Sequence, residues 1–392
     1  MTDFDQPFSR ADTHAVKYDA RQAVFGKADV MPLWVADMDL PSPRAVTEAL
    51  VARARHPAYG YTLFPDSLYQ AQIDWFRRRH GWATERAWLM MAPGVVPSLH
   101  AAALAFAEPG EGIIVQPPVY FPFFSAVTQT GRRLIENPLQ LRDGQWQMDL
   151  EHLEQCASDG ARLLFLCSPH NPVGRVWRRD ELEAVLAIAR RHELLVVSDE
   201  IHCDLTYPDR PAHTVLATLA GPEDRLITTV AASKTFNIPG LGLSSIVAPD
   251  PAHRSALKRE FERLHMGQCN PFSIAGYEAG YRDGKAWLDE LLPYLAGNRD
   301  FVHRFIAERL PEIRLVDPEG TYLLWLDCRA MGMSDTQLKA FFVEQAGVGL
   351  SPGAQFGTGG RGHMRMNIGA PRPTLEQAMA RIEAAMVAWR RA

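Results

Sequence analysis

Three polar residues with complementary chemistry each follow a short apolar run that is typical of a buried strand. Asn171 lies in SPHNPVG after ARLLFL, Asp199 begins DEIHCDL after LLVVS, and Lys234 lies in AASKTFNIPGLG after RLITTV. In open α/β sheets, ligands bind where the carboxyl ends of parallel strands meet. The spacing therefore predicts that the three side chains meet at one edge of a sheet, with Lys234 in a loop.

These three residue types suit pyridoxal phosphate. A lysine amine forms a Schiff base with this cofactor. An aspartate keeps the pyridine nitrogen protonated, so that the ring can accept electrons. A neutral donor such as Asn171 suits the ring hydroxyl. A lone lysine in a loop is usually a solvated surface charge, so the hypothesis depends on Asp199 and Asn171 as well as on Lys234.

Four motifs extend this pattern over the chain: WVADMD, GVVPS, DEIH and SKTFNIPGL. From about residue 7 to its end, the chain resembles the fold type I pyridoxal-phosphate enzymes, the aminotransferase class I/II superfamily. Within it, the motifs are similar to the cystathionine β-lyase (cysteine–sulfur lyase) branch. The resemblance implies an α/β fold, with a mostly parallel seven-stranded sheet between helices and a smaller α+β domain from the N- and C-terminal segments. We expect the arm and part of the small domain over 1–45, the large domain over 46–285 and the rest of the small domain over 286–392.

Composition and charge agree with this class of protein. The chain has 392 residues, 47% hydrophobic and 22% charged, which is ordinary globular composition with room for a large core. The net charge of −5 predicts no nucleic-acid partner. The acidic start MTDFDQPFSR is not a signal peptide, and no apolar run approaches the roughly 20 residues that span a bilayer. The five cysteines show no CxxC spacing, so we expect a cytoplasmic protein without disulfides.

Strand-like and helix-like segments alternate over most of the chain, which predicts a parallel or mixed sheet with helices on both faces. Residues 1–33 are predicted to be an irregular arm, and 34–39 a short edge strand or a loop. GHMRMNIG at 362–369 is predicted to be an edge strand. The sequence also predicts helices at 43–55, 66–80, 97–107, 149–158, 180–192, 334–346 and 374–391, a mostly helical stretch over 250–310, and strands at 88–93, 133–137 and 244–249 among others.

A phosphate site is predicted between the strand at 88–93 and the following helix. Gly94, Val95 and Val96 would form a tight turn that leads into a helix at Pro97. Unpaired amides and the helix dipole attract anions at such a place. Ser233 could be a turn hydroxyl, but its position before the lysine favours a donor to the phosphate.

One position departs from many aminotransferases, which carry an arginine facing the phosphate eight residues after the lysine. Here that position is Gly242. The remaining partners of the phosphate are left open. The departure favours the lyase branch.

The resemblance implies further contacts to the cofactor. Tyr120 would stack on its ring and take part in catalysis, unless it is a plain core residue. Tyr61, in the aromatic loop at 56–65, would reach the phosphate of the other subunit in a homodimer with shared active sites; packing is its alternative. His202 stands where many aminotransferases carry a tyrosine that bonds the ring hydroxyl, and its part in proton transfer is left open.

The resemblance also implies contacts to the substrate. Arg365 would bind the α-carboxylate in the bidentate way that a guanidinium allows, although an arginine in a strand is usually an edge charge. The backbone around Ala36 would border the same carboxylate, and Asn171 would lie beside it. At SPHNPVG the resemblance favours a cis bond between Asn171 and Pro172, which is uncommon among X–Pro bonds in general. No metal ligand set is predicted.

The branch implies α,β-elimination from cystathionine or another cysteine S-conjugate. Lys234, once displaced by the substrate amine, would take the Cα proton, and a thiolate would leave, giving pyruvate and ammonia. An aminotransferase acting on an L-amino acid and a 2-oxo acid would use the same residues, because fold does not settle reaction type. A non-catalytic regulatory protein on this fold is a lesser alternative. Regulators of this kind carry an N-terminal DNA-binding domain, and we expect one that had lost catalysis to have lost Lys234 or Asp199.

Overall fold

A seven-stranded mixed sheet forms the centre of the computed structural model, which describes residues 2–267 and 269–391. The order of its strands is β2-β10-β9-β8-β7-β3-β4. Strand β10 runs antiparallel to both of its neighbours, and the other pairs are parallel. The predicted mostly parallel seven-stranded sheet is therefore confirmed. The strands are β2 (Leu89–Ala92), β3 (Gly112–Val115), β4 (Arg133–Glu136), β7 (Ala161–Cys167), β8 (Leu195–Asp199), β9 (Leu226–Val230) and β10 (Ser244–Val247).

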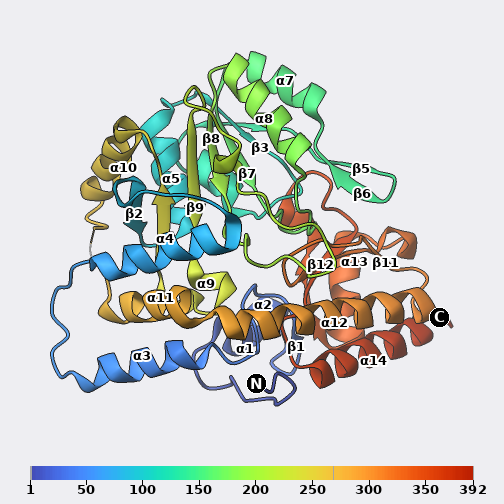
Figure 1. Cartoon of the computed structure of the whole chain (residues 1–392). Helices are drawn as coiled ribbons and strands as arrows, with labels where there is room; N and C mark the ends of the chain where they lie inside the picture. Colours follow the sequence, from blue (N-terminus) through green and yellow to red (C-terminus); the bar gives the residue numbers. More distant parts are fainter. Residues whose placement is uncertain (1, 268, 392) are drawn as a thin grey trace.

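Helices cover both faces of this sheet (Figure 1). In β8, Leu195 and Val197 pack with α5, α6 and α10 on one face, whereas Val196 packs with α7 and α8 on the other. A strand that is buried on both faces has no polar alternation, which explains the continuous apolar run in the sequence. These helices are α5 (Val95–Phe106), α6 (Pro122–Thr128), α7 (Leu150–Ser158), α8 (Arg179–Arg191) and α10 (Pro251–Arg263).

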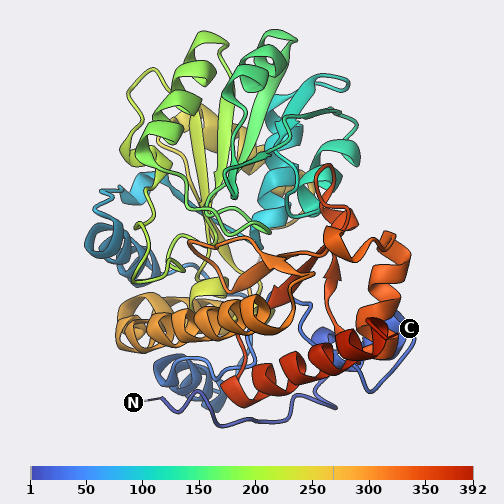
Figure 2. The same ribbon diagram turned by 90° about the vertical axis from the view of Figure 1, so that its right-hand side faces the viewer.

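A four-stranded antiparallel sheet forms the second structural layer, with the order β11-β12-β15-β14. In Figure 2 the seven-stranded sheet occupies the upper half of the molecule, and this smaller sheet lies below it with α12 and α14. The elements are β11 (Arg314–Leu315), β12 (Leu323–Asp327), β14 (Ser351–Pro352), β15 (His363–Asn367), α12 (Lys285–Arg309), α13 (Asp335–Ala340) and α14 (Arg372–Trp389).

The prediction of an edge strand at 362–369 is wrong. Strand β15 lies between β12 and β14, and all five of its residues are buried. Alternating polar residues normally indicate a half-exposed strand. In β15 the polar side chains of Arg365 and Asn367 point instead into buried hydrogen-bonded sites, described below.

The N-terminal segment is more ordered than the predicted irregular arm. It contains the short helices α1 (Val16–Asp19) and α2 (Arg21–Phe25) and strand β1 (Met31–Pro32), which pairs in parallel with β13 (Val348–Gly349). This pairing attaches the segment to the C-terminal part of the chain. The domain boundaries at residues 45 and 285 stay a prediction.

Two of the remaining helices, α3 (Arg44–Arg55) and α4 (Asp66–His80), follow the predicted bounds closely. The mostly helical stretch predicted over 250–310 consists of α10, α11 (Pro271–Asp283) and α12. Two starts differ. Helix α5 begins at Val95 rather than at Pro97, and α6 begins at Pro122 in a segment for which no helix is predicted from the sequence. Both differences involve a proline in the first helical turn. An amide at such a position has no hydrogen-bond partner within the helix, so a proline, which lacks that amide, fits there. Among residues 2–267 and 269–391, no helix has the length and apolar character needed to cross a membrane.

A short hairpin was not predicted. Strands β5 (Gln140–Arg142) and β6 (Gln145–Gln147) pair across Asp143 and Gly144, which both have positive φ angles. An Asp-Gly pair with positive φ at both positions is the usual two-residue hairpin turn.

Candidate active site

Adjacent strands bring the three predicted residues to one cavity. Asp199 ends β8 and pairs with Cys167, the last residue of β7; Asn171 follows four residues later. Lys234 lies on α9 (Ala232–Thr235), four residues after β9 ends, so it is on one helical turn rather than in a loop. All three residues line a cavity of about 220 Å³. The side chains meet as the spacing predicted, and the Asn171–Pro172 bond is cis as expected.

Most of the other predicted residues line the same cavity, and two do not. Arg365 reaches the cavity wall through a hydrogen bond to Asn171, described below. Tyr61 is 95% exposed and lies outside the cavity of its own chain. The lining residues that were predicted are Ala36, Gly94, Val95, Val96, Tyr120, His202 and Ser233, and those that were not are Pro97, Cys167, Ile201 and Pro239.

Burial of Lys234 lowers its pKa and so favours its neutral amine form. Its Nζ donates a hydrogen bond to the backbone oxygen of Ala36 over 2.6 Å. Burial lowers the pKa of Lys234 to about 8, with the charge of Arg365 acting in the same direction and Asp37 and Asp199 opposing it. A lysine with such a pKa carries an appreciable fraction of neutral, nucleophilic amine near neutral pH.

Burial has the opposite effect on Asp199. It raises the pKa of this carboxyl group to about 7, against the hydrogen bond that Oδ1 accepts from the Ile201 amide over 3.1 Å. A cation placed beside the carboxylate would favour its ionised form. The site is therefore suited to pairing with a protonated nitrogen.

His202 is held neutral. Burial lowers its pKa to about 3, and the charges of Lys234 and Arg365 add to this effect. The ring lies edge-on to Tyr322, with centroids 6.1 Å apart. Its Nδ1 is buried without a hydrogen-bond partner among the described residues. A neutral imidazole with an unused ring nitrogen can exchange hydrogen bonds with a ligand.

Arg365 is a site residue and not an edge charge, because only 3% of it is exposed. Its guanidinium donates to Asn171 Oδ1 over 3.1 Å, to Trp34 O over 2.8 Å and to Ser351 Oγ over 3.3 Å. It also lies over the ring of Phe356. Burial lowers its pKa to about 10, so it stays protonated at neutral pH. Nε is buried without a partner in the described part of the chain, which leaves a donor for an anion.

The start of α5 forms an anion site beside the cavity. Gly94 is the N-cap of this helix, and the bond from Ser98 N to Gly94 O is the first of its hydrogen-bond ladder. The amides of Val95 and Val96 precede that bond, so they have no intrahelical acceptor. Together with the helix dipole they can bind a phosphate. Ser233 lies on the same cavity wall.

Gly242 lies next to this anion site. It has a left-handed backbone, with φ of 58°, and a side chain there would begin 3.9 Å from the carbonyl oxygen of Pro93. A longer side chain at this position would start one residue away from the α5 cap.

Two hydroxyl groups of the site were missed. Tyr322, at the start of the four-stranded sheet, donates to the Ala36 oxygen over 2.9 Å, and Ser351 Oγ donates to the Trp34 oxygen over 3.0 Å. Both lie outside every motif in the sequence. The packing of the four-stranded sheet against residues 34–36 places these two hydroxyl groups at the site.

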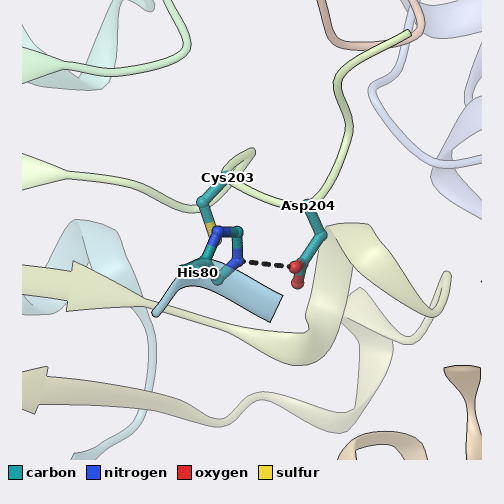
Figure 3. Close-up of side chains that lie close together, drawn as sticks. All are labelled: His80, Cys203 and Asp204. Carbon is teal, nitrogen blue, oxygen red and sulfur yellow. Dashed lines mark hydrogen bonds and ion pairs between the residues drawn. The ribbon is translucent and has the colours of Figure 1, made fainter. Parts of the chain in front are cut away.

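A cluster of His80, Cys203 and Asp204 resembles a metal ligand set, but hydrogen bonds account for it (Figure 3). The Asp204 carboxylate pairs with His80 over 2.9 Å and with Arg79 over 3.0 Å, and accepts a bond from Thr235 over 2.9 Å. The arginine charge opposes a cation here. Because Thr235 follows Lys234, the cluster instead ties α9 to helix α4.

Residues 28–382 match the aminotransferase class I and II family, and the chain belongs to this family. Its fold is fold type I of the pyridoxal-phosphate-dependent enzymes, as predicted. Among curated proteins it is 41% identical to cystathionine beta-lyase PatB of Bacillus subtilis, over 98% of this chain and 99% of that protein. It is 32% identical to protein MalY of Escherichia coli, over 97% of each. It superposes on cystalysin from Treponema denticola, a structure that contains pyridoxal 5'-phosphate, with a TM-score of 0.96 and 33% identity, over 99% of this chain and 100% of that one.

Proposed function

We propose that this protein is a pyridoxal-phosphate-dependent carbon–sulfur β-lyase. It would cleave cystathionine or a related cysteine S-conjugate to a thiol, pyruvate and ammonia. One observation carries the proposal: Lys234, Asp199 and Asn171 line a single cavity in a chain that is 41% identical, over 98% of its length, to a cystathionine beta-lyase.

The residues around the cavity fit the cofactor. Lys234 Nζ would bond its carbonyl carbon, Asp199 would pair with the ring nitrogen and Asn171 would donate to the ring hydroxyl. Tyr120 would lie against the ring, since it is one of the cavity-lining residues. For the phosphate, the chain offers the Val95 and Val96 amides and the hydroxyl of Ser233. His202 would be a further, neutral hydrogen-bond partner of the cofactor. When bound, the cofactor supplies a sink for the electron pair that is left on the substrate Cα.

The chain's own groups would place the substrate and move one proton. The Arg365 guanidinium and the backbone at Ala36 would hold the α-carboxylate, which fixes Cα near Lys234. Once the substrate amine has displaced it from the cofactor, Lys234 Nζ would take the Cα proton as general base; its pKa of about 8 suits this task near neutral pH. The Cβ–S bond breaks, its electron pair leaves with the thiolate, and hydrolysis of the remaining fragment gives pyruvate and ammonia.

A turnover assay separates this function from transamination, the second candidate, which the family itself supports. The purified protein is mixed with cystathionine in the absence of any 2-oxo acid, and pyruvate is measured over time. We expect pyruvate to be released continuously, far beyond one per active site. Release that stops at or below one equivalent, and resumes on adding a 2-oxo acid, would indicate an aminotransferase. No reaction at all would favour the regulatory alternative.

We further infer a homodimer with shared active sites, in the cytoplasm. Its support comes from the loop at 56–65, which is largely exposed and carries Tyr61 and Leu63, exposed by 95% and 86%. Tyr59 is held by its own chain, through a bond to Ala54 O over 2.7 Å. Tyr61 is therefore the tyrosine available to a partner subunit's phosphate. An obligate interface of this kind buries roughly 2,000 Å² or more.

Hybrid dimers test the shared site. Tyr61→Phe and Lys234→Ala should each be impaired alone. Refolded together, they should regain part of the activity, because a hybrid contains one site with both residues intact. The refolded single variants serve as controls. An active monomer in size-exclusion chromatography, or a mixture no more active than its parents, would contradict this arrangement.

A further inference from the structure

The backbone of residues 34–38 lies between the two sheets and is bonded by side chains along its length. Every carbonyl oxygen from Trp34 to Met38 accepts a hydrogen bond from a side chain. The donors are Arg365 and Ser351 to Trp34, Asn367 to Val35, Lys234 and Tyr322 to Ala36, Lys17 and Asn367 to Asp37, and Arg10 and Asn237 to Met38. Asn367 supplies two of these bonds, and Asn237 supplies one together with bonds to the Met38 amide and to Leu40 O. The proposed chemistry leaves both asparagines unused.

Asn237 binds the segment from the side of the large sheet. Its Oδ1 accepts the Met38 amide over 2.9 Å, and its Nδ2 donates to Met38 O over 3.0 Å and to Leu40 O over 2.8 Å. It lies three residues after Lys234 and has a left-handed backbone, with φ of 55°. Asparagine tolerates this conformation better than most residues. The short connection couples the position of Lys234 to that of residues 38–40.

Asn367 binds the same segment from the small sheet. Its Nδ2 donates to Val35 O over 2.6 Å and to Asp37 O over 2.7 Å, and its Oδ1 accepts the Gly369 amide over 2.7 Å. It is fully buried and lies two residues after Arg365 in β15. Residues two apart in a strand share a face, so Asn367 and Arg365 present their side chains to the same segment.

We propose that Asn237 and Asn367 are paired positioning residues, which fix the 34–38 backbone between Lys234 and Arg365. The Ala36 carbonyl oxygen accepts a hydrogen bond from the Lys234 amine. It lies between the carbonyls of Val35 and Asp37, which both accept hydrogen bonds from Asn367. The two amides thereby set the spacing between the proton-accepting amine and the guanidinium that receives the substrate. This inference rests on the proposed roles of Lys234 and Arg365.

The test removes one amide at a time. Asn237→Gly deletes the side chain but permits the left-handed backbone, because glycine has no Cβ to clash. Asn367→Ser is the second variant and keeps a small polar group. Either variant should loosen the segment and admit water to Lys234, so that the pKa of the amine moves back toward its ordinary value. The charged groups that act on Lys234, namely Asp37, Asp199 and Arg365, are unchanged in both.

Two measurements are made on each variant. In the cofactor-free protein, the labelling of Lys234 by an amine-acylating reagent is followed against pH by peptide mapping. We expect its midpoint to rise from about 8 by about 0.5 to 1 pH unit. In the loaded enzyme, we expect kcat/KM for cystathionine to fall by about ten- to a hundredfold, mainly through a higher KM, since small displacements of a bound substrate have effects of this size.

Matched controls separate positioning from general loss of stability. Glu193→Gly places glycine at another left-handed position, with φ of 54°, which precedes β8 at the opposite end of that strand from Asp199. Asn137→Ala removes a fully buried amide that bonds Asp149 O over 3.0 Å. Neither should move the labelling midpoint. If Asn237→Gly and Asn367→Ser both keep the wild-type midpoint and kcat/KM, the inference is overturned while the lyase proposal stands. If the cofactor is attached to another lysine, the proposed function fails and the inference with it.

Discussion

Replacement of Lys234 with alanine should lower pyruvate release from cystathionine by at least about a thousandfold. In the proposed mechanism Lys234 has two roles: it bonds the cofactor and it takes the Cα proton. A positioned general base alone contributes roughly 10²- to 10⁴-fold. The fold should survive, because within the described part of the chain the amine makes one hydrogen bond, to Ala36 O, and a buried cation is removed rather than introduced. Initial rates at saturating substrate, with circular dichroism as a check on folding, measure the effect.

Lys258→Ala is the matched control for that variant. Lys258 is also a lysine of the large-sheet region, but its side chain is 70% exposed on α10 and pairs with Glu262. Its loss should change the rate by less than about twofold, as expected for an exposed ion pair. If Lys234→Ala retains more than about a tenth of the wild-type rate, Lys234 is not the essential base.

Asp199→Asn should reduce turnover by about a hundredfold or more while the cofactor stays bound. An oriented electrostatic partner of this kind contributes roughly 3 kcal/mol. Asparagine has the same shape and can still accept the Ile201 amide, so packing is preserved. It carries no charge, however, and therefore does not favour a protonated pyridine nitrogen. The ring then becomes a poor acceptor for the electron pair on Cα.

Glu136→Gln is the control for the loss of a carboxylate. Glu136 also ends a strand of the same sheet, the edge strand β4, but it is not one of the residues that line the cavity. Cofactor content from the absorbance spectrum and pyruvate release are measured together for both variants. Near-normal turnover by cofactor-loaded Asp199→Asn would remove Asp199 from the proposed role.

The sequence alone predicts correctly those site residues that lie in short motifs at the ends of strands. Asn171, Asp199 and Lys234 each lie within a few residues of a strand end, and adjacent parallel strands must bring their ends together. Arg365 could be placed only by resemblance, because its bond to Asn171 joins residues 194 positions apart. The roles of Tyr322, Asn237 and Asn367 also depend on contacts between residues far apart in the sequence, which leave no local sequence pattern.

The wrong predictions also have local causes. Strand β15 has the polar alternation of an edge strand because its polar side chains serve a buried site. The predicted start of α5 lies two residues too late because proline is typical of the first helical position, whereas Val95 and Val96 precede Pro97 in this helix.

Reduction with borohydride followed by peptide mapping tests the central assignment most directly. Borohydride fixes the Schiff base between a lysine and pyridoxal phosphate as a stable bond. The yellow protein should lose its colour, and one peptide, the one that contains Lys234, should gain the mass of the reduced cofactor. A label on Lys258 or Lys285, or a purified protein that takes up no pyridoxal phosphate, would contradict the account.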